Sequence, residues 1–113
     1  MNNLKFEWDP KKASANEKKH GVSFEEARTV FFDENAKLID DPDHSKDEDR
    51  FVLLGLSSSL KVVLVCHCYR EEGNVIRIIS ARKASAFESK QYQKRWTMRK
   101  EYDFSKARKN PYA

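Results

Sequence analysis

The sequence predicts an α+β domain in which a small antiparallel sheet carries N-terminal helices on one face and a C-terminal basic helix. Three runs rich in β-branched residues, at 50–56, 61–69 and 75–82, alternate as strands do and are joined by short turn segments. Two Ser-x-x-Glu capping boxes, beginning at Ser23 and Ser85, mark helix starts outside these runs. The 113 residues suit one domain with a single core.

The N-terminal third is expected to form one short strand and two helices. Apolar and charged residues alternate from Leu4 to Trp8, which is typical of a half-buried strand. Asp9 followed by Pro10 predicts a helix from Pro10 to about His20 that stops at Gly21 and is solvated along its length. A second helix, expected from Ser23 to near 33, has apolar residues at helical spacing and belongs to the core.

The remaining segments complete the expected sheet and add a tail. A strand is predicted at 36–39 and an acidic loop at 40–49, before the three β-rich runs form an antiparallel meander on the second helix. A helix follows from Ser85. Residues 98–113 have neither helical nor strand periodicity, so we expect a tail that is ordered only if it docks.

Composition excludes some classes of protein and favours an anionic partner. No apolar run approaches the roughly 18 residues that a membrane span needs, and the N-terminus has no signal-peptide pattern, so we expect a cytoplasmic protein without membrane contact. Residues 77–113 hold 11 Lys/Arg and 3 Asp/Glu, which fits nucleic acid or an acidic protein, although a solvated basic helix is equally compatible. Cys66 and Cys68 are expected to be reduced and buried rather than zinc ligands.

The strand at 75–82 and the helix after it carry the most informative cluster of side chains. Strict alternation would place Arg77 and Arg82 on opposite faces, each among apolar neighbours. Glu88, Tyr92 and Arg95 follow near the same junction. Because cations beside an apolar sheet need a partner, this cluster suggests an anionic ligand, most plausibly phosphate.

Four segments carry a resemblance to a known family. They are Phe6-Glu7-Trp8-Asp9, Lys19-His20-Gly21-Val22-Ser23-Phe24, Asp41-Pro42-Asp43-His44-Ser45 and Arg77-Ile78-Ile79-Ser80-Ala81-Arg82-Lys83-Ala84. With them, residues 5–96 resemble the BrnT toxins. The resemblance implies a small ribonuclease, related in fold to the RelE and ParE toxins, that inhibits translation and needs no cofactor. It also implies an RNA substrate, a BrnA-like antitoxin in a hetero-oligomer, and operator DNA contacted only through the antitoxin.

The tail has a resemblance of its own. Met98 to Ser105 and Asn110 to Ala113 are similar to the opening of BrnA-type antitoxins, which divides the chain into a toxin domain at 1–97 and an appended tail at 98–113. Overlapping reading frames would account for this resemblance, and so would a tail that touches the active surface of its own chain.

Cleavage of RNA without a metal requires a base, cations that stabilise the phosphorane, and an acid. Arg82 and Arg77 are the candidates for phosphate stabilisation, and Arg82 has the better position. Glu88 closes a capping box and is also a candidate general base. Tyr92 could stack on a base or simply cover the sheet. His67 is suited to proton transfer, although a core imidazole is the more common role at such a position.

Six further side chains are candidate RNA contacts: Lys19, His20, Lys83, Lys90, Lys94 and Arg95. His20 also suits the negative end of its helix. The alternative function is a non-catalytic, ParE-like module that binds nucleic acid or protein through the same basic face. An Arg82 locked in an internal ion pair, with no open concave surface beside Tyr92 and Arg77, would argue against the nuclease.

Overall fold

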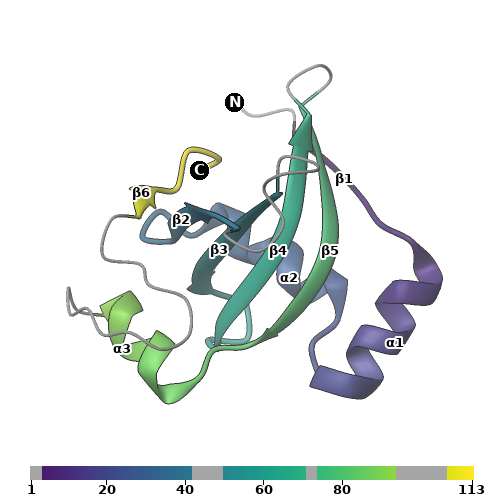
Figure 1. Ribbon diagram of the computed structural model, residues 1–113, viewed down its shortest axis with the longest axis horizontal. Coiled ribbons are helices and arrows are strands. Elements are labelled where there is room, and N and C mark those ends of the chain that lie inside the picture. Colours follow the sequence, from purple (N-terminus) through teal and green to yellow (C-terminus); the bar gives the residue numbers. More distant parts are fainter. Residues whose placement is uncertain (1–3, 42–49, 71–73, 94–106) are drawn as a thin grey trace.

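The computed structural model describes residues 4–41, 50–70, 74–93 and 107–113, and it has a six-stranded mixed sheet with three α-helices (Figure 1). The sheet order is β1-β5-β4-β3-β2-β6. The elements are β1 (Lys5–Glu7), α1 (Pro10–His20), α2 (Phe24–Thr29), the 3-10 turn η1 (Val30–Phe32), β2 (Lys37–Asp40), β3 (Arg50–Leu56), β4 (Val62–Arg70), β5 (Val75–Lys83), α3 (Ala86–Gln93) and β6 (Arg108–Lys109).

The α+β class and the antiparallel meander of β3, β4 and β5 are confirmed, but the sheet is not purely antiparallel. β1 pairs with β5 in parallel, with Lys5 opposite Val75. The two strands are far apart in the sequence, so no hairpin turn fixes their relative direction. Residues 42–49 of the expected acidic loop, and residues 98–106 of the expected tail, lie outside the described residues.

A β-bulge in β5 changes which face its side chains take. The pairing of β5 with β4 skips Ile79, so the alternation of side chains shifts by one residue at that point. Arg77 therefore lies opposite Cys68 and Arg82 opposite Leu64, and Cys68 and Leu64 share one face of β4. The prediction that the two arginines lie on opposite faces is wrong, because it assumed an unbroken strand.

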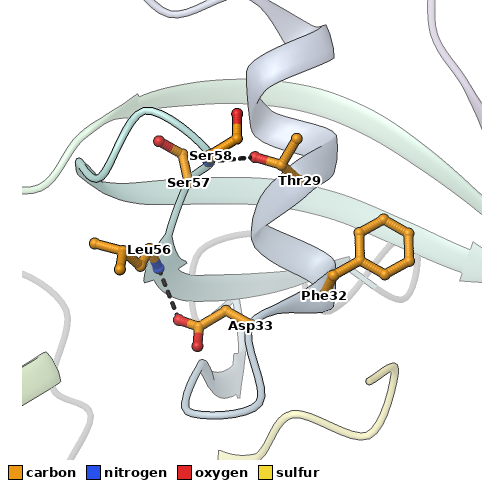
Figure 2. A pocket seen from close by; sticks show the side chains of 6 residues that line it. All are labelled: Thr29, Phe32, Asp33, Leu56, Ser57 and Ser58. Carbon is orange, nitrogen blue, oxygen red and sulfur yellow. Dashed lines mark hydrogen bonds between the residues drawn. The ribbon is translucent and has the colours of Figure 1, made fainter.

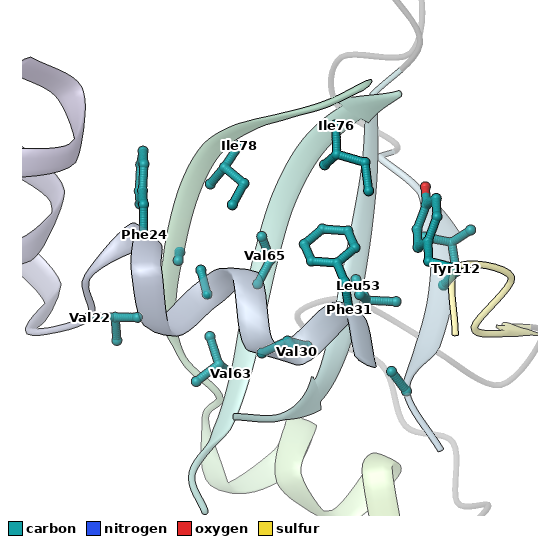
Figure 3. Close-up of a cluster of buried hydrophobic side chains, with 14 residues drawn as sticks. Val22, Phe24, Val30, Phe31, Leu53, Val63, Val65, Ile76, Ile78 and Tyr112 are labelled. Carbon is teal, nitrogen blue, oxygen red and sulfur yellow. The ribbon is translucent and has the colours of Figure 1, made fainter. Parts of the chain in front are cut away.

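The main core lies between one face of the sheet and α2 with η1 (Figure 3). Phe24 and Phe31 are fully buried there against valines and isoleucines of β4 and β5. The second helix therefore belongs to the core, as its apolar spacing predicts. It ends earlier than expected, at Thr29, and continues as η1.

A smaller cluster covers the opposite face of the sheet. Val52, Leu54 and Leu64 form it, and Tyr92 of α3 and Ala107 of the C-terminal segment pack against it. The two cysteines of β4 point to this face and form no disulfide with each other, as the sequence predicts. The prediction that they are buried is wrong, because both are partly exposed.

The caps of the helices follow the sequence signals, with one addition. The N–H of Lys11 donates to Asp9 at 2.9 Å, and Gly21 ends α1 with a φ of 74°. The buried Asn16 is the addition, since α1 was expected to be solvated throughout: its amide donates to Val22 O at 3.0 Å and Ala81 O at 2.9 Å. The helix is thereby fixed to the edge of β5. None of the helices in the described ranges has the length and apolarity to cross a membrane.

Candidate functional site

Four arginines of the described strands lie on the face of the sheet that carries α3: Arg50, Arg70, Arg77 and Arg82. We call three of them, Arg50, Arg77 and Arg82, the arginine face. Arg50 of β3 and Arg77 of β5 both lie opposite Cys68, on either side of β4. Arg82 lies opposite Leu64, four residues further along that strand. Because strand residues advance about 3.4 Å each, Arg77 and Arg82 are about 14 Å apart along the sheet.

Arg82 is held in a fixed orientation by Glu88 at the start of α3. Its Nη1 and Nη2 atoms donate to the two carboxylate oxygens at 2.9 and 3.0 Å, which is the bidentate geometry of a guanidinium fork. The Glu88 side chain is fully buried, whereas 36% of the Arg82 side chain is exposed. The buried Glu88 carboxylate therefore fixes the orientation of the Arg82 guanidinium group, while part of the Arg82 side chain remains exposed to solvent.

The capping box of α3 explains why Glu88 is in this position. The Ser85 N–H donates to Glu88 Oε1 at 2.9 Å, and the Glu88 N–H donates to Ser85 Oγ at 3.1 Å. This reciprocal pair is the one that the Ser-x-x-Glu pattern predicts. Glu88 thus joins the helix start to the arginine at the end of β5.

Arg77 has an ion pair on the other edge of β5. Its Nη1 atom lies 3.1 Å from Glu7 Oε2 on the parallel neighbour β1, and Arg70 donates to the same oxygen at 3.0 Å. The Arg77 side chain is 44% exposed, so solvent screens this pair more than the pair at Glu88.

The thiol of Cys66 lies between the arginines on the same face. Burial raises its pKa, and a hydrogen bond with Ser80 and the charges of Arg82 and Arg50 oppose that rise only in part. The thiol is therefore neutral at physiological pH, which argues against a thiolate nucleophile. Among the described residues, no three His, Cys, Asp or Glu side chains are grouped so that they could hold a metal ion.

An open pocket lies at the end of β3 (Figure 2). It has a volume of about 370 Å³ and is lined by Thr29, Phe32, Asp33, Leu56, Ser57 and Ser58. The Asp33 carboxylate accepts hydrogen bonds from the Tyr92 hydroxyl at 2.6 Å and from the Leu56 N–H at 2.8 Å. Burial and the Asp33 carboxylate raise the pKa of Tyr92, so its phenol stays protonated.

An internal ion pair of Arg82 without an open concave surface beside Tyr92 and Arg77 would argue against a nuclease, and the structure meets this condition only in part. Arg82 does have an internal ion pair, but a concave surface exists next to the carboxylate that binds Tyr92. Arg77 does not line that pocket. The pocket and the arginine face are thus two separate features, connected through α3.

Comparison with known proteins decides the family. A family model described as the ribonuclease toxin, BrnT, of type II toxin-antitoxin systems matches residues 8–88. This chain belongs to the BrnT toxin family. Its fold is similar to the crystal structure of the Brucella abortus ribonuclease toxin, BrnT, with a TM-score of 0.58 and 25% identity. That match covers 74% of this chain and 99% of the Brucella chain. A search of curated proteins finds no match.

Family membership confirms the resemblance in the sequence, and the structure then sorts the predicted site residues of this BrnT chain. His67 is fully buried, with Nδ1 3.2 Å from Val65 O and Nε2 3.0 Å from the Tyr112 hydroxyl. Burial lowers the pKa of His67 to about 4. Because its side chain is fully buried, His67 cannot reach RNA for the predicted proton transfer, and the structure favours its role as a core imidazole.

The four predicted RNA contacts that the structure describes do not gather on one surface. Lys19 and His20 end α1, which lies beside β5 (Figure 1). Lys90 is exposed on α3. Lys83 lies opposite Val63 and so points to the other face from Arg82. Lys94 and Arg95 lie outside the described residues.

Sequence reasoning missed two members of the site, Arg50 and Glu7. The sequence did contain a signal for Arg50, because the serine turn at 57–59 sets the register of β3 and β4 and so brings Arg50 opposite Cys68. Glu7 had no local signal, since its contact with Arg77 depends on the parallel pairing of β1 with β5.

Proposed function

We propose that this BrnT-family chain is an endoribonuclease that cleaves RNA through attack of the 2′-hydroxyl on the adjacent phosphate, without a catalytic metal ion. The observation that carries the proposal is the arginine face: three guanidinium groups on one side of the sheet, one of them oriented by a buried carboxylate. Guanidinium forks match phosphate oxygens and remain charged at all physiological pH values.

We infer different tasks for the arginines from their spacing. Since Arg77 and Arg82 are about 14 Å apart, they contact different phosphates of one RNA strand. Arg82 is the residue we assign to the scissile phosphate, because Glu88 fixes its orientation before RNA binds and no reorganisation is needed during the reaction. Arg50 and Arg77 bind the neighbouring phosphates and position the strand.

The reaction itself breaks one bond and forms another at phosphorus. The 2′-oxygen forms a P–O bond and loses its proton, while the P–O5′ bond breaks and the leaving oxygen takes up a proton. Glu88 acts in this scheme as a positioning residue, because both its oxygens already accept hydrogen bonds inside the protein. Tyr92, protonated and partly exposed, offers an aromatic face for a base beside the scissile position.

The proposed cellular role follows from the family. A ribonuclease of this kind inhibits translation, and a BrnA-like antitoxin neutralises it by forming a hetero-oligomer with the toxin. Contact with operator DNA takes place through the antitoxin.

The experiment that tests this proposal is cleavage of RNA by the purified protein in excess EDTA, followed by analysis of the product ends. We expect 2′,3′-cyclic phosphates and 5′-hydroxyls. Cleavage only with an added divalent ion would overturn the metal-free mechanism.

A non-catalytic binding module is the second candidate. It is favoured by the ion pairs of Arg77 with Glu7 and of Arg82 with Glu88, since such pairs also occur for purely structural reasons. A protein that binds RNA or a partner protein and leaves every RNA intact, with or without divalent ions, would establish that alternative.

A further inference from the structure

The last residues of the chain fold back onto the sheet and cross its edge. Arg108 and Lys109 form β6, which pairs antiparallel with β2, the strand that would otherwise end the sheet. Ala107, before β6, packs on the cluster of Val52 and Leu54, whereas Tyr112, after it, enters the main core. The segment 107–113 therefore passes from one face of the sheet to the other at the β2 edge. Figure 1 shows β6 beside β2 at this edge.

Asn110 is the first of two anchors in this segment. Its amide donates to Phe31 O at 3.0 Å and Asp33 O at 2.9 Å, which are carbonyls at the end of η1. The side-chain oxygen of Asn110, Oδ1, accepts a hydrogen bond from the Tyr112 N–H at 2.8 Å. This local turn fixes the backbone conformation between the two anchors. A helix end leaves carbonyls without partners within the helix, so an amide donor suits this position.

Tyr112 is the second anchor, and only 8% of its surface is exposed. Figure 3 shows Tyr112 with Phe31 in the main core. The Tyr112 ring lies against Phe31, His67 and Tyr69, with centroid distances of 5.2, 5.5 and 5.5 Å. Its hydroxyl lies 3.0 Å from Nε2 of the buried His67. The protein thus provides an aromatic cup with a polar atom at its base that matches a phenol.

Outside these anchors the segment is weakly held. The Arg108–Asp40 ion pair is 59% and 69% exposed, so it contributes little to stability. The backbone pairing extends over two residues only. The match to the family model covers residues 8–88, so the segment 107–113 lies outside the matched part of the chain.

We propose that the β2 edge and the aromatic cup form a peptide-docking groove, and that residues 107–113 are its intramolecular ligand. The partner that fits the groove in trans is a protein segment that adds a strand to β2 and carries Asn, with Tyr two residues later. The identity of that partner as the antitoxin rests on the proposed function; the groove itself does not. The attached segment competes with the partner for the same groove.

The test uses the full-length chain and a fluorescent peptide with the sequence of residues 107–113. The Asn110→Ala/Tyr112→Ala double variant has lost both anchors, so its groove is vacant. We expect it to bind the peptide at least about 10-fold more tightly than the wild type, in which the attached segment competes at an effective concentration near the millimolar range. Lys109→Ala, which keeps both anchors, is the matched control and should bind as weakly as the wild type.

Each other outcome overturns the proposal. A double variant that does not fold, as judged by circular dichroism at 25 °C, would make the segment part of the fold rather than a ligand. Equal binding of a peptide that lacks the asparagine would remove the claimed specificity. If light scattering shows that the wild type is a dimer and the double variant is a monomer, the groove binds a second copy of the chain instead. Since the assay contains no RNA, its result is independent of whether the chain is a nuclease.

Discussion

The bidentate contact between Arg82 and Glu88 should contribute measurably to the stability of the fold. Glu88→Gln keeps the size of the side chain and can keep one acceptor for the Ser85 N–H. It replaces the other acceptor by an NH₂ group that faces a guanidinium donor. Hydrogen bonds to charged groups each contribute about 1.5–3 kcal/mol, and the exposure of Arg82 reduces the Coulombic part. We therefore expect a loss of about 2–3 kcal/mol in the free energy of unfolding.

The assay is urea unfolding at pH 7 and 25 °C, followed by circular dichroism. A loss of this size is a large fraction of the stability of a domain of this length, and it corresponds to a Tm decrease on the order of 10 °C. Glu25→Gln, at an exposed position of α2, is the matched control and should change the free energy by less than about 0.5 kcal/mol.

A double-mutant cycle separates the contact from the individual substitutions. Combining Glu88→Gln with Arg82→Gln should give a coupling energy of at least about 1 kcal/mol, because each single variant already disrupts the bidentate hydrogen bonds between these two side chains. If Glu88→Gln matches the control, or the coupling is near zero, the claim that Glu88 holds Arg82 in place is refuted.

Three further predictions concern stability. The folded-state pKa of His67, about 4, lies below the ordinary value of 6.5, so its contribution to stability is fully present above pH 6.5 and is lost as the pH falls towards 4. We expect this loss to reach about 3 kcal/mol, and unfolding titrations of His67→Gln should show a flatter pH dependence. Gly55→Ala would place a Cβ 2.7 Å from Ala36 Cβ and 2.9 Å from Val30 Cγ1, so chemical denaturation should reveal a loss of about 1–3 kcal/mol. Gly21→Ala has open space but a φ of +74°, and a thermal melt should show a loss of about 1 kcal/mol.

The sequence predicted the local features of this fold well because they depend on local physics. The α1 boundaries follow from Asp9, Pro10 and Gly21, and the α3 start follows from the reciprocal hydrogen bonds of Ser85 and Glu88. Strand alternation likewise identified β3, β4 and β5 to within a residue or two.

What the sequence did not predict depends on contacts between distant parts of the chain. The bulge at Ile79 reverses the relative facing of Arg77 and Arg82, and it arises from the pairing of β5 with β4 rather than from any local residue pattern. The burial of Tyr112 has the same origin, since its cup is built from side chains of η1 and β4. The sequence therefore identified Arg77, Arg82 and Glu88 as candidates, but it missed Arg50 and Glu7 and did not predict how these side chains come together.

The most direct test of the central claim is the single-turnover rate of RNA cleavage in EDTA for alanine variants of the arginine face. Arg82→Ala should reduce the rate by about 100-fold or more, since it removes a charge placed at the reacting phosphate. Arg50→Ala and Arg77→Ala should act mainly on RNA affinity and on its dependence on salt. Arg28→Ala, at an exposed position of α2, is the matched control and should leave the rate unchanged. If folded Arg82→Ala cleaves RNA at the rate of the Arg28→Ala control, the arginine face is not the catalytic surface.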